Sequence, residues 1–489
     1  MKDIFLHAKS KRFIIACFCF LFGITLASVF DIRLSVIFSV TTALVIVSFF
    51  LLYWKQKTQR IICLFAALFF LGMVRYGQVF PTTLPKEGPT HMIAFVAEEP
   101  DVRQDRVNYI VQPFFHQTGP LVDADLIDTR IFIRSELYPR YSYGDVLDIR
   151  CALRYPEPIE DFRYDLYLAK EGIFLSCNQP YIQKLYAGEG NIFLRYLFAF
   201  KGTVAQHIAE LWHEPYAGFM AGLLYGYRGG LGSLNELFAI TGVTHIIAIS
   251  GYNITLIATL CLTACTYAVI PRKKAFWLVC AIITTFVIFA GASASVVRAG
   301  IMGIIVLLAR QLGRGSSIAP TMLCCACIMV WFNPLILLFD AGFQLSFLAT
   351  LGLVYISPII STRLHAFPAL YGIKESVIST LSATISTLPI ILYQFERLSI
   401  VSIMVNVLVL WILPFTMLFG FISVVSHVFF APLAAVFSWM SWAMMAYVVY
   451  VVRLFASLSF AAVPFAIPLW CCLALYCGII YGIYKQPRV

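Results

Sequence analysis

The chain has 489 residues, of which 61% are hydrophobic and only 12% are charged, and its formal net charge is +10. Soluble domains carry about 25% charged residues, so this composition excludes an ordinary soluble protein and indicates a polytopic membrane protein. Of the 14 cysteines, 12 lie in hydrophobic runs, where a free thiol behaves as a small apolar side chain.

Several uncharged runs are long enough to cross a membrane, since a spanning helix needs about 20 apolar residues. The runs of full length are 34–53, 335–357, 399–424 and 433–452, and slightly shorter ones are 13–30, 61–74, 275–291 and 464–484. We therefore predict a polytopic α-helical protein with about 12 transmembrane helices. The first three form an N-terminal membrane segment over residues 1–80.

Residues 81–190 form the one polar interval of the chain. They hold 11 Lys/Arg and 17 Asp/Glu, a balance of −6, whereas the rest of the chain carries +16. Short β-branched or aromatic segments bounded by Pro, Gly or charged residues predict a small inserted β domain here. The expected strands are 94–100, 106–115, 128–137 and 145–153, and a short helical pattern follows at 162–173.

Clusters of Lys and Arg predict the orientation of the chain, because such clusters stay on the cytoplasmic side. They lie at 2–12, 55–60, 272–274, 310–314 and 485–488. With 12 crossings, all of these segments and both termini are cytoplasmic, and residues 81–190 are extracytoplasmic. The two cysteines of that domain, Cys151 and Cys177, then predict a disulfide; two buried thiols are the alternative.

The chain after the β domain begins with an amphipathic pattern at 191–214, which predicts a helix at the membrane interface. Residues 215–489 form the main membrane domain. Its first apolar run, 216–227, is too short to span a bilayer. Glycines recur there every fourth residue, and a second ladder of small residues follows; both predict close backbone packing. These ladders are Gly218, Gly222, Gly226 and Gly230, and Ser295, Ala299 and Gly303.

The apolar run 236–257 is interrupted by Ser250, Gly251, Tyr252 and Asn253, and it carries one ionisable side chain, His245. In hydrocarbon, an unsatisfied backbone group costs several kcal/mol, so a broken helix persists only where protein or water covers it. Discontinuous helices of this kind often form the site in proteins that move solutes. A kinked packing helix with a satisfied histidine is the alternative.

Polar side chains inside other apolar runs are further candidates, because ionisable groups at membrane depth are scarce. Arg298 and Asp340 are charged, Gln344 follows Asp340 by one helical turn, and Glu396 and Arg397 lie at a helix end. Each either lines a pathway or holds helices together. A buried Arg298–Asp340 pair, or an Asp340 that caps a helix, belongs to the second possibility.

Hydroxyl side chains follow one helical face of residues 376–393, namely Ser376, Thr380, Thr384 and Thr387. They either line a water-filled pore or donate hydrogen bonds to backbone carbonyls of their own helix or of a neighbouring helix. The sequence has no phosphate-binding loop of the GxxxxGK[ST] type, no HxHxDH or HExxH cluster, and no Ser/His/Asp set. We therefore expect no catalytic residues, no cofactor and no metal, and hence no enzyme.

Several segments, in consistent order, resemble the ComEC competence-protein family. Asn406 lies in the last of these segments, at a position that matches the family's pattern. They are DFRYDLYLAKEGI (161–173), LLYGYRGGLGSLNELFAITGV and THIIAISGYNITLI (223–257), VVRAGIMGIIVLLARQLGR (296–314), NPLILLFDAGFQLSFLATLGL (333–353) and STLPIILYQFERLSIVSIMVNVLVL (386–410). The candidate pathway then comprises the helix break beside Arg298, Asp340, Gln344 and Asn406.

The resemblance implies a channel in the bacterial inner membrane that passes a single strand of DNA during natural transformation. It also implies an OB-fold-like outer domain, a platform often used for single strands. Many members have Gly-Leu-His where this chain has Gly251-Tyr252-Asn253, and many carry a C-terminal metallo-β-lactamase-like domain that is absent here. We therefore expect membrane lipid, a separate nuclease, a DNA receptor and a cytoplasmic motor as partners.

The charge of residues 81–190 argues against tight non-specific DNA binding, which needs a cationic surface. A local path remains possible where arginines alternate with aromatic residues, although aromatic strands are more often core. The arginines are Arg103, Arg106, Arg130, Arg134 and Arg140. Two alternatives to a DNA channel stay open: a transporter of a smaller solute, and a membrane scaffold that docks a partner through its outer domain.

Overall fold

The fold is described from a computed structural model of the chain. It describes residues 9–33, 41, 48, 55–81, 86–103, 105–114, 126–127, 129–159, 163–227, 229–247, 251–312, 318–363 and 373–485. The chain divides into two compact units. The first comprises Met1–Arg195, Ile254–Thr284 and Val297–Phe343, and the second comprises Tyr196–Asn253, Thr285–Val296 and Gln344–Val489.

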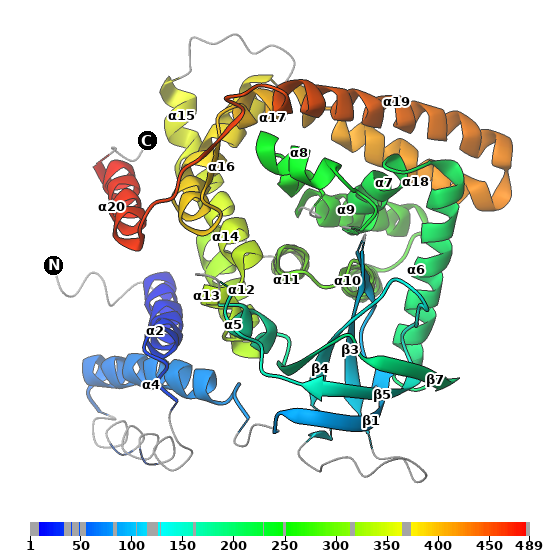
Figure 1. Ribbon diagram of the computed structural model, residues 1–489. Coiled ribbons are helices and arrows are strands. Elements are labelled where there is room, and N and C mark those ends of the chain that lie inside the picture. The colour runs from blue at the N-terminus through cyan, green and yellow to red at the C-terminus, as the bar shows by residue number, and fades with distance from the viewer. Residues whose placement is uncertain are drawn as a thin grey trace. The chain divides into compact units, whose positions relative to one another are not determined.

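The predicted β domain is present in the first unit as one curved sheet (Figure 1). Its strands are β1 (Gly88–Val96), β2 (Asp101–Val102), β3 (Val107–Pro113), β4 (Arg130–Ser135), β5 (Asp145–Leu153), β6 (Ile173–Asn178) and β7 (Tyr181–Ala187). The order is β6-β4-β3-β1-β5-β7, with β2 paired to β3. Only β4 and β6 run parallel among these pairs.

The sheet curls on itself, because an isolated bridge joins Arg154, just after β5, to Ser176 in β6. Strand β3 alternates buried and partly buried residues along its whole length, which is the pattern of a strand with one face on a core. Val107, Tyr109 and Val111 are fully buried there. Helix α5 (Tyr164–Ala169) fills the connection between β5 and β6, where the helical pattern was predicted.

Apolar helices complete the first unit. They are α2 (Lys9–Val29), α4 (Lys57–Gly77), most of α9 (Gly251–Tyr267), α10 (Arg272–Phe289) and α11 (Ala294–Gln311), α12 (Ile318–Phe332) and α13 (Ile336–Phe339). Glycines let α2 and α4 approach closely: a Cβ at Gly23 would collide with the carbonyl oxygen of Phe69, and one at Gly72 with that of Phe20. The predicted run 34–53 lies outside the described residues, apart from positions 41 and 48.

The second unit holds the remaining helices. They are α6 (Ile192–Leu211), α7 (Tyr216–Tyr225), α8 (Leu234–Thr241), α14 (Ala341–Tyr355), α15 (Ser357–Arg363), α16 (Ile373–Gln394), α17 (Ser402–Val409), α18 (Leu413–Phe429), α19 (Ala431–Ala456) and α20 (Leu469–Lys485). A short ribbon pairs β8 (Arg397–Ser399) with β9 (Ala462–Pro464). The predicted helix at 191–214 is therefore present as α6, and the short apolar run 216–227 contains α7.

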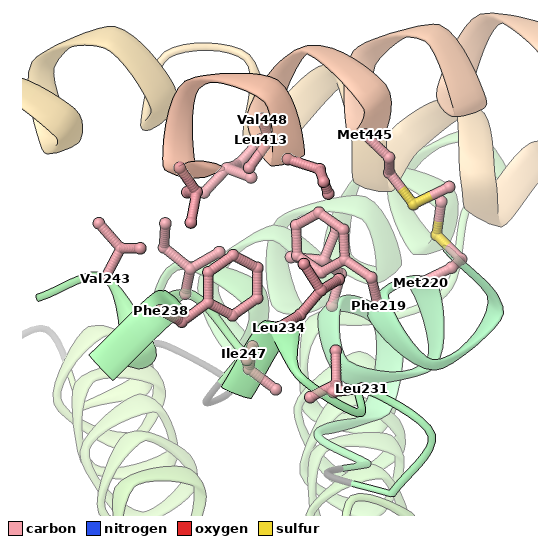
Figure 2. Packing of buried hydrophobic residues seen from close by; sticks show 14 of the residues in the cluster. Phe219, Met220, Leu231, Leu234, Phe238, Val243, Ile247, Leu413, Met445 and Val448 are labelled. Carbon is pink, nitrogen blue, oxygen red and sulfur yellow. The ribbon is translucent and has the colours of Figure 1, made fainter. Parts of the chain in front are cut away.

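The core of the second unit gathers side chains from α7, α8, α18 and α19 (Figure 2). Phe219 and Phe238 are fully buried, and their ring centroids lie 5.4 Å apart. Met220 and Met445 point toward one another above them. The apolar cluster also contains Ile247, so it reaches the segment that follows α8.

Five helices of the described residues are long and apolar enough to cross a membrane, namely α2, α4, α11, α16 and α19. The number rises to seven if two bent pairs each form one span: α14 with α15, bent by 42°, and α17 with α18, bent by 48°. The chain is thus a helical membrane protein with a small β domain. The count of about 12 crossings stays a prediction.

Candidate functional site

The backbone break that the sequence predicted lies earlier than expected. Helix α8 ends at Gly242, whose φ of +72° is left-handed, and a short 3₁₀ turn follows at Thr244–Ile246. Helix α9 begins at Gly251, so Gly251 and Asn253 belong to its first turn rather than to the interruption. Ser250 lies outside the described residues. The non-helical stretch thus begins at Gly242, because a left-handed glycine ends a helix more effectively than Ser-Gly-Tyr-Asn does.

The turn after Gly242 separates apolar from polar side chains. Val243, Ile246 and Ile247 are buried in the core of the second unit, whereas the side chains of Thr244 and His245 are exposed. The imidazole of His245 bonds the backbone of Gly242. The turn is therefore anchored from one side and presents a hydroxyl and an imidazole on the other.

The amide residues of the candidate pathway occupy different helices of the second unit. Asn253 on α9 and Asn406 on α17 are buried, with 7% and 5% of their surface exposed. The side-chain oxygen of Asn406 has no hydrogen-bond partner among the described residues. Gln344 on α14 accepts a hydrogen bond of 2.7 Å from Gln394 at the end of α16. The structure thus joins Gln344 to a glutamine that sequence reasoning did not single out.

The two charged candidates, Arg298 and Asp340, belong to the first unit. The backbone carbonyl of Arg298 on α11 lies 3.6 Å from the thiol of Cys325 on α12. Asp340 separates α13 from α14, and one of its carboxylate oxygens accepts a 2.9 Å bond from the N–H of Phe343. The alternative in which Asp340 caps a helix is therefore confirmed.

The ion-pair partner of Asp340 is Lys170 rather than Arg298. Its second carboxylate oxygen lies 2.7 Å from the Lys170 ammonium, which follows α5 in the β domain. The side-chain amide of Asn333 also donates a 2.6 Å bond to the carbonyl of Lys170. Sequence reasoning missed Lys170 and Asn333 as site residues, although both lie in the segments that carried the family resemblance.

Hydroxyl side chains of α16 bond backbone carbonyls. Ser382 and Thr387 bond carbonyls four residues earlier, at 2.6 and 2.9 Å, and Ser386 reaches the carbonyl of Leu348 on α14 at 2.6 Å. A Cβ at Gly352 of α14 would lie 2.7 Å from that of Ser386. Of the four predicted positions, Thr387 therefore follows the packing alternative, whereas the buried hydroxyl of Thr380 has no hydrogen-bond partner among the described residues.

The glycine ladders also serve close packing. At Gly218 a Cβ would lie 2.7 Å from the carbonyl carbon of Gly230, and at Gly222 it would lie 2.8 Å from Ile247. Gly303 of the second ladder faces Ile254 at 3.4 Å. The two glycines of α7 therefore face the loop that follows α7 and the turn that follows α8.

Cys151 on β5 and Cys177 on β6 contact each other through their sulfur atoms. Both are free thiols in the structure, and Cys177 is almost fully buried. The hydrogen bond to Cys151, together with burial, raises the pKa of the Cys177 thiol well above its ordinary value. The disulfide between these two residues stays a prediction.

Most arginines of the predicted DNA path on the β domain are engaged by neighbouring groups. Arg103 pairs with Asp101 at 2.8 Å, Arg106 with Asp105 at 3.5 Å and Arg130 with Glu98 at 2.6 Å. Arg134 bonds the hydroxyl of Tyr164, and Arg140 lies over the ring of Tyr138, 5.0 Å from its centroid. The aromatic residues Tyr109, Tyr141 and Tyr143 are buried, so here aromatic strands serve as core.

Among the described residues, no group of three or more His, Cys, Asp or Glu side chains could hold a metal ion.

Comparison with known proteins decides the family. A sequence profile described as "Competence protein" matches residues 223–488, which is more than half of the chain. The chain belongs to the competence protein family. It is also 30% identical over 210 residues to the "ComE operon protein 3" of Bacillus subtilis strain 168, a match that covers 41% of this chain. The match spans about a quarter, 26%, of that relative. No solved structure matches the chain.

The family match covers much of the second unit and the helices around the break. It includes His245, Asn253, Arg298, Asp340, Gln344 and Asn406. The β domain and Lys170 precede the matched residues, so the ion pair between Lys170 and Asp340 joins the competence-family region to a part of the chain outside it.

Proposed function

We propose that the chain is an inner-membrane channel that passes a single strand of DNA into a bacterial cell during natural transformation. Membership of the competence protein family carries this proposal. The break between α8 and α9 supports it, because irregular backbone at membrane depth is tolerated where it lines a cavity or is covered by protein. The exposed Thr244 and His245 would face the moving strand, and no residue is assigned a catalytic role.

The β domain is proposed to be an OB-type barrel that receives the strand outside the membrane. Its strand order supports this, since the OB fold is a five-stranded, partly open Greek-key barrel. Strand β1 pairs with both β3 and β5, β4 runs parallel to β6, and the Arg154–Ser176 bridge brings β5 back to β6. The exposed ring of Tyr138 under Arg140 would be the stacking contact.

A channel of this kind needs partners. We propose a separate nuclease for the second strand, a DNA receptor at the outer surface and a cytoplasmic motor, with lipid around the apolar helices.

The test is uptake of labelled double-stranded DNA by the source cells, with and without this gene. The proposal expects that deletion removes label from the cytoplasm while label still binds the cell surface. If cytoplasmic label is unchanged and no second copy of the gene replaces it, the chain is not the channel.

A transporter for a smaller solute is the second candidate. The observation that favours it is the charge of the β domain: residues 81–190 carry −6, and Arg103, Arg106 and Arg130 already pair with carboxylates. Such a surface attracts a polyanion weakly. Binding of a fluorescent oligonucleotide to the purified protein separates the two candidates, because a DNA channel binds it with a steep salt dependence and a small-solute transporter does not.

A further inference from the structure

The end of α5 is buried against membrane helices of the same unit, and this contact has two halves. The apolar half joins Ala169 to Leu335, which precedes α13, and to Tyr76 of α4. Ala169 is 3% exposed, Leu335 0% and Tyr76 1%. Phe174, the second residue of β6, extends the contact toward Phe80, with ring centroids 6.4 Å apart. A six-residue helix at the edge of a β domain would otherwise leave this side open to solvent.

The polar half surrounds Lys170. Its ammonium lies 2.7 Å from Asp340, and the two side chains are only 9% and 14% exposed. Its backbone carbonyl accepts the 2.6 Å hydrogen bond from Asn333. The ring of Tyr167 lies 4.2 Å from the ammonium, and Glu171, which is far more exposed, lies 3.5 Å from it. The side chain and the backbone of one residue are thus both held by the segment 333–340.

The two oxygens of Asp340 act on different parts of the chain. One caps the first turn of α14 through Phe343, and the other binds Lys170. Burial lowers the pKa of Lys170, but Asp340, Tyr167 and Glu171 outweigh that effect and leave the pKa above its ordinary value. The lysine is therefore charged at neutral pH, and Lys170 and Asp340 form an ion pair that is largely shielded from solvent.

We infer that Lys170, Asn333 and Asp340 form a docking joint that seats the outer β domain on α4 and the segment 333–343, and that Asp340 is a positioning residue rather than a contact for the transported molecule. The joint is independent of what the chain transports. Its loss would free the β domain from the helices without unfolding that domain, whose core is formed by side chains of β1, β3, β4, β5 and β6.

A double-mutant cycle tests the joint, because removing one member of a buried pair strands the other charge, whereas removing both does not. The variants are Asp340→Asn, which keeps an oxygen for the N–H of Phe343, Lys170→Met, and the two combined. The readout is backbone hydrogen exchange over residues 166–174 and 335–343 in the purified full-length protein. Each single variant should accelerate exchange at least about tenfold, and the double variant should exchange more slowly than either single one.

Glu171→Gln is the matched control, since Glu171 is also near Lys170 but its side chain is 46% exposed. It should leave exchange within about twofold of the parent protein, as exposed ion pairs contribute little. Unchanged exchange in both single variants overturns the inference, and so does a double variant that fails to exchange more slowly than either single one.

If a single variant gives no folded protein, recovery of yield by the double variant supports the joint. If the double variant also fails, Asn333→Asp is the milder test. It keeps the oxygen that accepts from the N–H of Leu335 and removes the donor to Lys170. Faster exchange confined to residues 169–174 supports the joint, and unchanged exchange overturns it.

DNA uptake by the same strains separates this inference from the proposed function. Loss of uptake in Asp340→Asn and in the double variant, with exchange unchanged, would place Asp340 in the pathway and reject the joint. Altered exchange in a protein that proves to import no DNA would leave the joint standing and reject the channel.

Discussion

Asp145, the first residue of β5, is the most enclosed carboxylate among the described residues of the β domain, with 4% of its side chain exposed. One oxygen accepts a 2.9 Å bond from the N–H of Ser142 and lies 2.7 Å from Lys184 on β7. Asp145→Ala leaves the partly buried N–H of Ser142 without its charged acceptor, which costs roughly 1–3 kcal/mol. Amide exchange near β5 should therefore accelerate about 5- to 150-fold. Asp105→Ala, which removes a carboxylate that is 71% exposed, is the control. Equal exchange rates in the two variants would contradict the prediction.

Asp165, in the first turn of α5, predicts a pH dependence. Burial raises its pKa, but the two bonds from Arg163 and the N–H of Leu166 outweigh burial, so the pKa lies below its ordinary value. A carboxylate with a lowered pKa stabilises the fold above its ordinary value of about 3.9, and the stabilisation is lost as the pH falls through the lowered value.

The measurement is exchange of the α5 amides, corrected for the intrinsic rate, in the parent protein and in Asp165→Asn. At pH 6 the variant should be less protected, by about 0.3–1 kcal/mol for a charge at a helix N-terminus. The difference should shrink toward zero as the pH drops below the ordinary value. A difference that stays constant down to pH 2 would rule out the carboxylate as its source.

Asp340 and its partner show how much of the candidate site could be predicted from the sequence. Asp340 stands out in an apolar run, and the possibility that it caps a helix was visible beside Gly342 and Phe343. Its partner was not visible, because Lys170 lies 170 positions away and only the tertiary structure brings the two together. Long-range pairs of this kind leave no periodicity in the sequence.

At the scale of elements, the turn after α8 depends on Gly242. Its φ of +72° is strained for any residue with a Cβ, and a Cβ there would lie 2.7 Å from that of Ser402. Gly242→Ala should cost about 1–2 kcal/mol for the left-handed conformation alone, and the collision with α17 adds to this. We expect a lower melting temperature and a lower folded yield of the purified protein.

Gly202→Ala is the matched change in the other direction. Gly202 lies within α6, and nothing stands within 4 Å of the added Cβ. Alanine in a helix interior should stabilise by roughly 0.5–1 kcal/mol relative to glycine. If both alanine variants shift the melting temperature in the same direction, the conformation at Gly242 does not control stability.

Elements with a strong local signal were well predicted, and those that depend on pairing were not. The strand at 145–153 and the helices at 162–173 and 191–214 all occur, since alternation and helical periodicity are local properties. Local sequence patterns could not predict the parallel pairing of β4 with β6 or the position of the helix break. The break depends on the backbone conformation of one glycine, and Gly242 is one of several in the region.

For the whole molecule, charge predicts orientation more directly than helix counting does. The described residues contain five to seven candidate spans, whereas the basic clusters were satisfied together by about 12 crossings. The difference arises partly because short or broken apolar helices such as α7, α12 and α20 fall below the length of a complete span, and partly because residues 34–53 are largely outside the described part. An even number of crossings places both termini on one side.

Orientation can be tested with epitope tags on otherwise intact protein. A tag between Glu157 and Pro158, both exposed in the loop after β5, should be labelled by antibody on spheroplasts without permeabilisation. A tag after Val489, beyond the basic residues Lys485 and Arg488, should be labelled only after the membrane is opened. Labelling of the C-terminal tag on intact spheroplasts would require an even number of crossings between an outside β domain and the C-terminus, and would exclude the arrangement of 12 crossings, which has nine there. Failure to label the tag at Glu157 would instead place the acidic β domain in the cytoplasm, where neither a DNA-receiving barrel nor the positive-inside arrangement could hold.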